Sequence, residues 1–330
     1  MQREVHNYYS SVLASLGLYK YFNDELKYTF YFGGKFKGFT PDYIIKNNVN
    51  FILGDLKKSF TNIDKIKKYD KEDKDLIEWV NHNETSIKQF ENYIDTNASD
   101  VFLLSNGIYT DHMKIFSKFC LTSKLINNLS ILSFNIIPGA NTRIIQINSI
   151  LNNFKDVNLK QKFEFGTIKY FSGEIQDLEK KYKLIETNKT EVPIEYIMAI
   201  LWMDIFPELN KESSYQKIIN KKLKKESIFS CKLDDILNIT DKFTLPYFCE
   251  QGEKNQFKKE LIILAMNGFK KLNLVEINND EYIIHWKDLN YKDNRGDLIT
   301  NFIKKVKDEQ INISLKQLNT KKLTDFPNLI

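Results

Sequence analysis

The stretch GFTPDYIIKNNVNFILGDLKKS, residues 38–59, decides the fold of the N-terminal part of this chain. Its two apolar runs, YII and VNFIL, are separated by a turn-forming KNN, which predicts two neighbouring strands. Asp42 precedes the first run, and Asp55 and Lys57 follow near the end of the second. Because an unpaired buried charge costs free energy, charged side chains at the ends of buried strands predict a site with a chemical purpose.

The flanking segments extend this pair of strands into a larger unit. Before it, an apolar stripe at helical spacing predicts a helix that ends at Gly17. The stripe consists of Val5, Tyr8, Val12, Leu13 and Leu16. Strands are then predicted over Leu26–Phe32, Phe36–Ile45 and Val49–Leu56, and their tight connections favour an antiparallel meander.

A helix predicted from about Glu84 to Ile94 and a strand over Val101–Leu104, followed by a turn at Ser105-Asn106-Gly107, complete the order αβββαβ. If this last strand returns beside the third, the helix forms a right-handed crossover and the two strands are parallel. The expected fold class is therefore α/β with a mixed sheet.

The rest of the chain predicts an extension of this unit and then a second region. Residues 111–190 alternate helix-like and strand-like segments, so we assign residues 1–190 to one domain with its core in 1–110. Residues 191–330 are mainly helical, and an amphipathic helix over Lys258–Leu272 leads into a hairpin in residues 274–286. A helix followed by a two-stranded ribbon is typical of a winged helix.

The acidic residues and the lysine fit one kind of chemistry. Side chains alternate along a strand, so Asp55 and Lys57 point the same way, and antiparallel pairing brings Asp42 near Asp55. Two neighbouring carboxylates repel each other unless a cation or a proton is shared. Hard oxygen ligands favour Mg²⁺, and a nearby lysine can orient or deprotonate a water, which suits hydrolysis of a phosphodiester.

These residues carry a family resemblance. Pro41-Asp42, twelve further residues and then Asp55-Leu56-Lys57 resemble the motif of the PD-(D/E)xK nuclease superfamily, whose core has the same αβββαβ order. Asp55 replaces the commoner glutamate, which the family tolerates. The resemblance covers about residues 1–110.

The resemblance implies further site residues. Glu4 matches the acidic residue that many members add to the metal site, and the backbone carbonyl of Leu56 joins Asp42 and Asp55 as a ligand of Mg²⁺, for which Mn²⁺ can substitute. Gln89 and Tyr93 match the QxxxY element, and the segment from Gln89 to Ile108 is similar to the nuclease domain of type I restriction subunits. The catalytic set that the resemblance implies is Asp42, Asp55, Lys57, Glu4, Gln89 and Tyr93.

The composition of the 330 residues excludes several other classes. No apolar run is long enough for a membrane span, and the N-terminus lacks the pattern of a secretory signal, so a cytoplasmic location is expected. A phosphate-binding glycine loop is absent, which argues against a nucleotide cofactor. The odd, widely spaced cysteines and isolated histidines match no disulfide framework or zinc site.

A net charge of +5 permits a polyanion partner. A basic run in residues 215–225 is the candidate DNA-binding surface, although an exposed helix in a lysine-rich chain explains it equally well. Its lysines are Lys217, Lys221, Lys222, Lys224 and Lys225.

The leading hypothesis is a Mg²⁺-dependent endonuclease acting on double-stranded DNA, in restriction or anti-phage defence. One alternative is a transposon end-cleaving subunit that acts with a partner transposase, and another is a non-catalytic DNA-binding subunit. A double-strand break needs two active sites or two successive events, so a homodimer or a partner subunit is expected on DNA.

Overall fold

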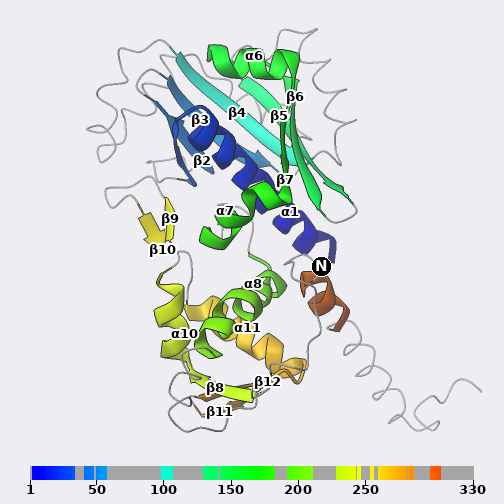
Figure 1. Cartoon of the computed structure of the whole chain (residues 1–330), viewed down its shortest axis with the longest axis vertical. Coiled ribbons are helices and arrows are strands. Elements are labelled where there is room, and N and C mark those ends of the chain that lie inside the picture. The colour runs from blue at the N-terminus through cyan, green and yellow to red at the C-terminus, as the bar shows by residue number, and fades with distance from the viewer. Residues whose placement is uncertain are drawn as a thin grey trace, which may run out of the picture. The chain divides into compact units, whose positions relative to one another are not determined.

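The computed structural model describes residues 2–33, 41–47, 50–57, 98–106, 129–139, 142–182, 192–210, 228–242, 244–246, 253–255, 259–279, 281–285 and 298–305. The protein is an α/β protein with a seven-stranded mixed, curled sheet, accompanying helices and a small antiparallel sheet (Figure 1). The chain divides into two compact units. The large-sheet unit comprises residues 7–191 and 243–256, and the small-sheet unit comprises residues 1–6, 192–242 and 257–330.

The strands of the large sheet lie in the order in which they occur along the chain. They are β1 (Thr29–Tyr31), β2 (Tyr43–Lys46), β3 (Asn50–Lys57), β4 (Ala98–Asn106), β5 (Leu129–Pro138), β6 (Arg143–Leu151) and β7 (Ile168–Phe171). Neighbouring strands are antiparallel from β1 to β3, parallel from β3 to β5 and antiparallel from β5 to β7. A separate ribbon pairs β9 (Thr244–Pro246) with β10 (Glu253–Asn255).

This topology confirms the predicted meander and the parallel return of β4 beside β3. The helix predicted over residues 84–94 lies outside the described residues. The turn predicted at Ser105 and Asn106 is wrong, because β4 continues through both residues. The central strands are apolar on both faces, as parallel strands covered on both sides require: Phe51–Leu53 and Val101–Leu104 are all buried.

One face of the large sheet packs against α1 (Gln2–Tyr19), which continues as a π-helix, η1 (Lys20–Glu25) (Figure 1). The prediction that Gly17 ends this helix is wrong. A Cβ atom at Gly17 would lie 3.2 Å from Cγ2 of Ile145 and 3.7 Å from the Tyr170 ring. Gly17 therefore serves close packing of the helix on β6 and β7, and tertiary contact overrides its low helix propensity.

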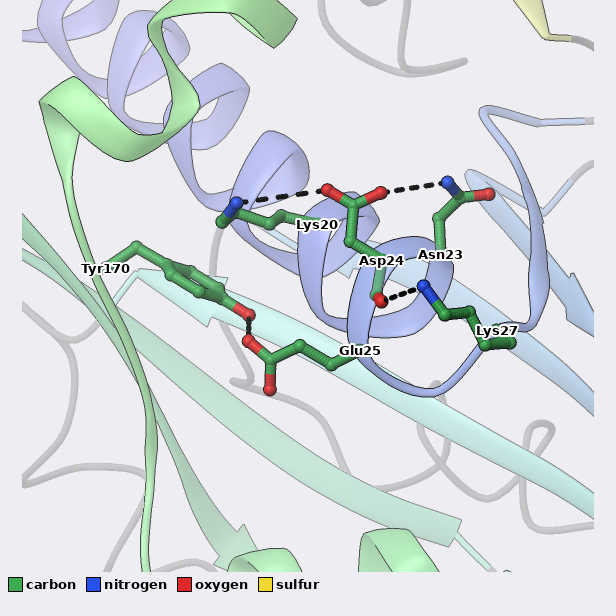
Figure 2. A network of polar contacts seen from close by, with 6 residues as sticks. All are labelled: Lys20, Asn23, Asp24, Glu25, Lys27 and Tyr170. Carbon is green, nitrogen blue, oxygen red and sulfur yellow. Dashed lines mark hydrogen bonds and ion pairs between the residues drawn. The ribbon is translucent and has the colours of Figure 1, made fainter.

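Polar contacts fix η1 to the far edge of the sheet. Figure 2 shows the Tyr170 hydroxyl of β7 donating to the Glu25 carboxylate, while the Lys20 ammonium lies over the Tyr170 ring. The Lys27 ammonium donates to the Asp24 carbonyl at 2.7 Å, and the backbone of Lys27 has a φ of 60°. The two contacts with Tyr170 hold η1 against β7, the last strand of the sheet.

The helix α6 (Val157–Phe165) begins at a buried acidic network, and η4 (Ser172–Ile175) and α7 (Gln176–Lys181) follow β7. The Asp156 carboxylate caps α6 by accepting from the Leu159 N–H at 3.0 Å, and it also accepts from the Tyr28 hydroxyl and the Asn50 amide. Asp100 of β4 accepts from the N–H groups of Lys155 and Asp156, at 2.8 and 2.9 Å.

This network predicts a pH dependence of stability. Burial raises the pKa of the Asp100 carboxyl from 3.8 to about 6, although the N–H groups of Lys155 and Asp156 lower it in part. Because the folded state then binds the proton more tightly, Asp100 stabilises the fold below about pH 4 and loses this contribution as the pH rises through 6. Urea unfolding of the wild type and of Asp100→Asn should give a difference in unfolding free energy that falls by up to about 3 kcal/mol between pH 4 and 7.

The comparison with Asp100→Asn cancels the titration of the other carboxylates, which both proteins share. A difference that stays constant over this pH range would contradict the expected titration of Asp100.

Among the described residues, the small-sheet unit has the order helix, strand, helix, helix, strand, strand, helix. Its elements are α8 (Ile194–Ile200) with η5 (Leu201–Ile205), β8 (Ile228–Lys232), α10 (Leu233–Thr240), α11 (Lys259–Lys271), β11 (Val275–Asn278) and β12 (Glu281–His285), and residues 298–305 are helical. The sheet order is β11-β12-β8. The predicted amphipathic helix and hairpin are thus confirmed, and the rings of Trp202, Phe206, Phe269 and Phe302 form an aromatic core.

No helix in the described ranges is long and apolar enough to cross a membrane.

Candidate active site

The two predicted acidic residues lie opposite each other where β2 begins and β3 ends. The antiparallel register pairs Tyr43 with Gly54, so the next position places Asp42 opposite Asp55. Both carboxylates are buried, with 5% and 2% of their residue surfaces exposed. Buried acidic residues this close together require hydrogen bonds or a cation to offset their desolvation and mutual repulsion.

Asp42 is held by the backbone of the facing strand. Its Oδ2 accepts from the Leu56 N–H at 2.7 Å. Since the N–H and C=O groups of one strand residue leave the strand on the same edge, the Leu56 carbonyl lies on the edge that faces Asp42. One backbone oxygen and two carboxylates therefore gather at this corner of the sheet.

Asp55 is held by Lys57, two residues further along the same face of β3. The Lys57 ammonium donates to Oδ2 of Asp55 in an ion pair, and 16% of the Lys57 side chain is exposed against 3% for Asp55. The ammonium thus offsets part of the charge of the two carboxylates, and Lys57 is the most accessible of the three side chains. The formal charges of the three side chains sum to −1, which favours the binding of a cation.

Tyr43 and Gly54 are the strand neighbours of Asp42 and Asp55, and they pair with each other. The Tyr43 ring stacks on Phe102 with centroids 6.0 Å apart, and its hydroxyl lies 2.7 Å from the hydroxyl of Ser15 in α1. Burial, followed by the negative charge of Asp42 and more weakly that of Asp55, raises the pKa of Tyr43 well above its usual range. Both carboxylates are therefore electrostatically close to a neutral, fixed ring.

The oxygens at this corner suit a hard divalent cation. Among the described residues, no group of three or more His, Cys, Asp and Glu side chains is placed to hold a metal ion. Asp42, Asp55 and the Leu56 carbonyl nevertheless form a set of oxygen donors of the kind that Mg²⁺ accepts, because this ion keeps several waters and needs only one or two carboxylates. The residues present fit a Mg²⁺ site that is completed by water.

For the remaining predicted site residues, the side chains lie outside the part of the chain that the structure describes. Glu4 lies in the first turn of α1, but its side chain is outside the described residues. Gln89, Tyr93 and the five lysines of residues 217–225 also lie outside them. Their proposed roles remain predictions.

One nearby polar residue was missed as a site residue in the sequence. Ser105 is fully buried on β4 and stands in register with Lys57. The sequence interpretation assigned Ser105 to a turn. If the predicted strand had been extended through Ser105, side-chain alternation would have placed it on the same face as Leu103.

No family model, no curated protein and no solved structure matches this chain.

Proposed function

We propose that this protein is a Mg²⁺-dependent endonuclease that hydrolyses phosphodiester bonds of double-stranded DNA. The observation that carries the proposal is the convergence of Asp42, Asp55 and Lys57 at adjoining strand ends, with both carboxylates buried. The order of α1 and β1 to β4, with β4 parallel to β3, supports a restriction-endonuclease-like core. Mn²⁺ should substitute for Mg²⁺ because both accept the same oxygen ligands.

The roles of the residues follow from their contacts. Asp42, Asp55 and the Leu56 carbonyl would hold the cation, which when bound acts as a Lewis acid on the phosphate and on a water. The Leu56 N–H fixes the orientation of Asp42. Lys57, the most accessible of the trio, orients the attacking water and offsets negative charge as the phosphate reacts.

The small-sheet unit is proposed to read the DNA. Its order of elements and its β11-β12-β8 sheet support a winged helix, in which α11 would enter the major groove. Lys270 and Lys271 in the last turn of α11 are exposed and can contact phosphates, as can the five lysines predicted from residues 217–225. This division of labour predicts cleavage at defined sequences, as in restriction or anti-phage defence.

A second candidate is a transposon end-cleaving subunit that acts with a partner transposase. One observation favours it: α11 exposes Ile263 and Leu264, with 36% and 51% of their surfaces accessible. Apolar side chains on the outer face of a helix suit a protein partner better than DNA phosphates.

The test is cleavage of phage DNA by the purified full-length protein. With Mg²⁺ or Mn²⁺ we expect discrete fragments, and EDTA should stop the reaction because the carboxylates then hold no cation. Ca²⁺ should support DNA binding in a gel shift with little cleavage, since it occupies oxygen sites but orders water differently.

Each outcome separates the candidates. Cleavage that continues undiminished in EDTA would refute the metal-dependent mechanism. Binding in Ca²⁺ without cleavage in Mg²⁺ would favour a non-catalytic subunit, and cleavage that appears only with an added partner protein would favour the transposon-type subunit.

A further inference from the structure

Ser105 carries a buried hydroxyl that the proposed roles leave unexplained. The residue has 0% of its surface exposed, and among the described residues nothing lies within hydrogen-bonding distance of its Oγ. Most buried hydroxyl groups are hydrogen-bonded, so an exception calls for a functional or solvent partner. Ser105 sits near the carboxyl end of β4.

The register of the sheet places Ser105 beside Lys57, on the face of the sheet that carries Asp55 and Lys57. Ser105 pairs with Lys57 across the parallel β3 and β4 strands, just as Leu103 pairs with Asp55. Paired residues on neighbouring strands point to the same face, and their strands are about 4.8 Å apart. Ser133 of β5, also buried, is the partner of Ser105 on the other side and extends the polar row.

We propose that the Ser105 hydroxyl and the Lys57 ammonium together hold the water that attacks the phosphodiester, an inference that rests on the proposed nuclease function. A water fits better than a substrate phosphate, because Ser105 is closed off while Lys57 is partly exposed. A buried water needs two to four polar partners, and this row supplies the hydroxyls of Ser105 and Ser133 and the Lys57 ammonium.

In this arrangement Ser105 accepts one hydrogen of the water and leaves a lone pair of its oxygen for phosphorus. During hydrolysis the water oxygen bonds to phosphorus, and the bond from phosphorus to the leaving sugar oxygen breaks. One proton of the water passes to bulk solvent, and the leaving oxygen takes a proton from solvent. Ser105 positions the water and is not consumed.

The test compares Ser105→Ala with Ser130→Ala. Ser130 is a buried serine on β5 whose Oγ accepts from the Asn153 N–H at 3.0 Å, so its hydroxyl is structural. Ser105→Ala should keep or raise the melting temperature, because it removes a hydroxyl that has no partner among the described residues. It should lower kcat about 100-fold through loss of water positioning. Ser130→Ala should lower the melting temperature and leave kcat unchanged.

Three further measurements test the role of Ser105. DNA affinity in Ca²⁺ should be the same for the wild type and Ser105→Ala, and Ser105→Thr should recover part of the rate. A crystal structure of the metal-free protein should show a water within hydrogen-bonding distance of both Ser105 Oγ and Lys57 Nζ.

Failure of this inference is distinct from failure of the proposed function. An active wild type with Ser105→Ala cleaving at the same rate, or with that variant binding DNA more weakly, would overturn the water-holding role and leave the nuclease standing. A wild type that cleaves no DNA under any of the metal conditions would overturn both.

Discussion

Replacing Asp55 with alanine is expected to lower the rate of Mg²⁺-dependent DNA cleavage by about 10⁴-fold or more, while the protein still folds and binds DNA. The carboxylate is buried, is paired with Lys57 and lies opposite Asp42. Among the described residues, no third acidic side chain is placed with these two to replace it as a cation ligand. A metal that acts on the phosphate and on the water contributes several kcal/mol to lowering the barrier, which corresponds to a loss of this size.

The measurement is single-turnover cleavage at saturating Mg²⁺, with circular dichroism to verify the fold. Lys57→Ala should lower the same rate by about 10²- to 10⁴-fold, the range expected when a group that handles a proton is lost. Asp177→Ala is the matched control, because this carboxylate lies in α7 on the surface and its side chain is fully exposed. Cleavage by Asp55→Ala at the wild-type rate would show that the buried acidic pair has a structural role.

Replacing Gly54 with alanine is expected to lower the free energy of unfolding by about 3 kcal/mol, at the upper end of the usual cost of overpacking a core. A Cβ atom at this position would lie 2.3 Å from the tip of the Phe102 ring and 2.8 Å from the Tyr43 ring. Both rings are fully buried and stacked on each other, so neither can move aside without disturbing its neighbours. Urea unfolding at neutral pH gives the free energy.

Gly173 provides the control for Gly54. A Cβ atom at Gly173 meets nothing within 4 Å, so Gly173→Ala should change the free energy of unfolding by no more than about 0.5 kcal/mol. Equal effects of the two substitutions would mean that backbone freedom, and not the packing of Phe102 and Tyr43, governs the response.

The strands around the candidate site could be predicted because their sequence carries strong local signals. The YII and VNFIL runs are bounded by turn residues, and the side-chain alternation of β3 places Asp55 and Lys57 on one face. Alternation alone does not fix side-chain rotamers or strand register. The Asp55–Lys57 ion pair depends on the rotamers, and the hydrogen bond from the Leu56 N–H to Asp42 depends on the register.

Other parts of the fold depend on contacts between distant residues, and the sequence interpretation missed them. The apolar run of β5, LSILSFNIIP, has no clear helical or strand period, so its place in the sheet could not be assigned. From the sequence, Gly17 is typical of a helix end, whereas in the structure it allows β6 and β7 to approach the helix closely. Ser105 belongs to the site through its register with Lys57, and that pairing joins segments 48 positions apart (105 minus 57).

The polar contacts that join the start of the large-sheet unit to its end also bear on how the protein is made. Tyr9 donates to Glu179, Glu25 accepts from Tyr170, and Tyr28 donates to Asp156, so each contact spans well over 100 residues. During synthesis α1 leaves the ribosome before these partners do, and contacts between distant residues form slowly and late. The helix that supports Tyr43 through Ser15 is therefore secured only after residue 179 has been synthesised. A nascent chain would thus carry all three charged residues of the candidate site long before it could use them.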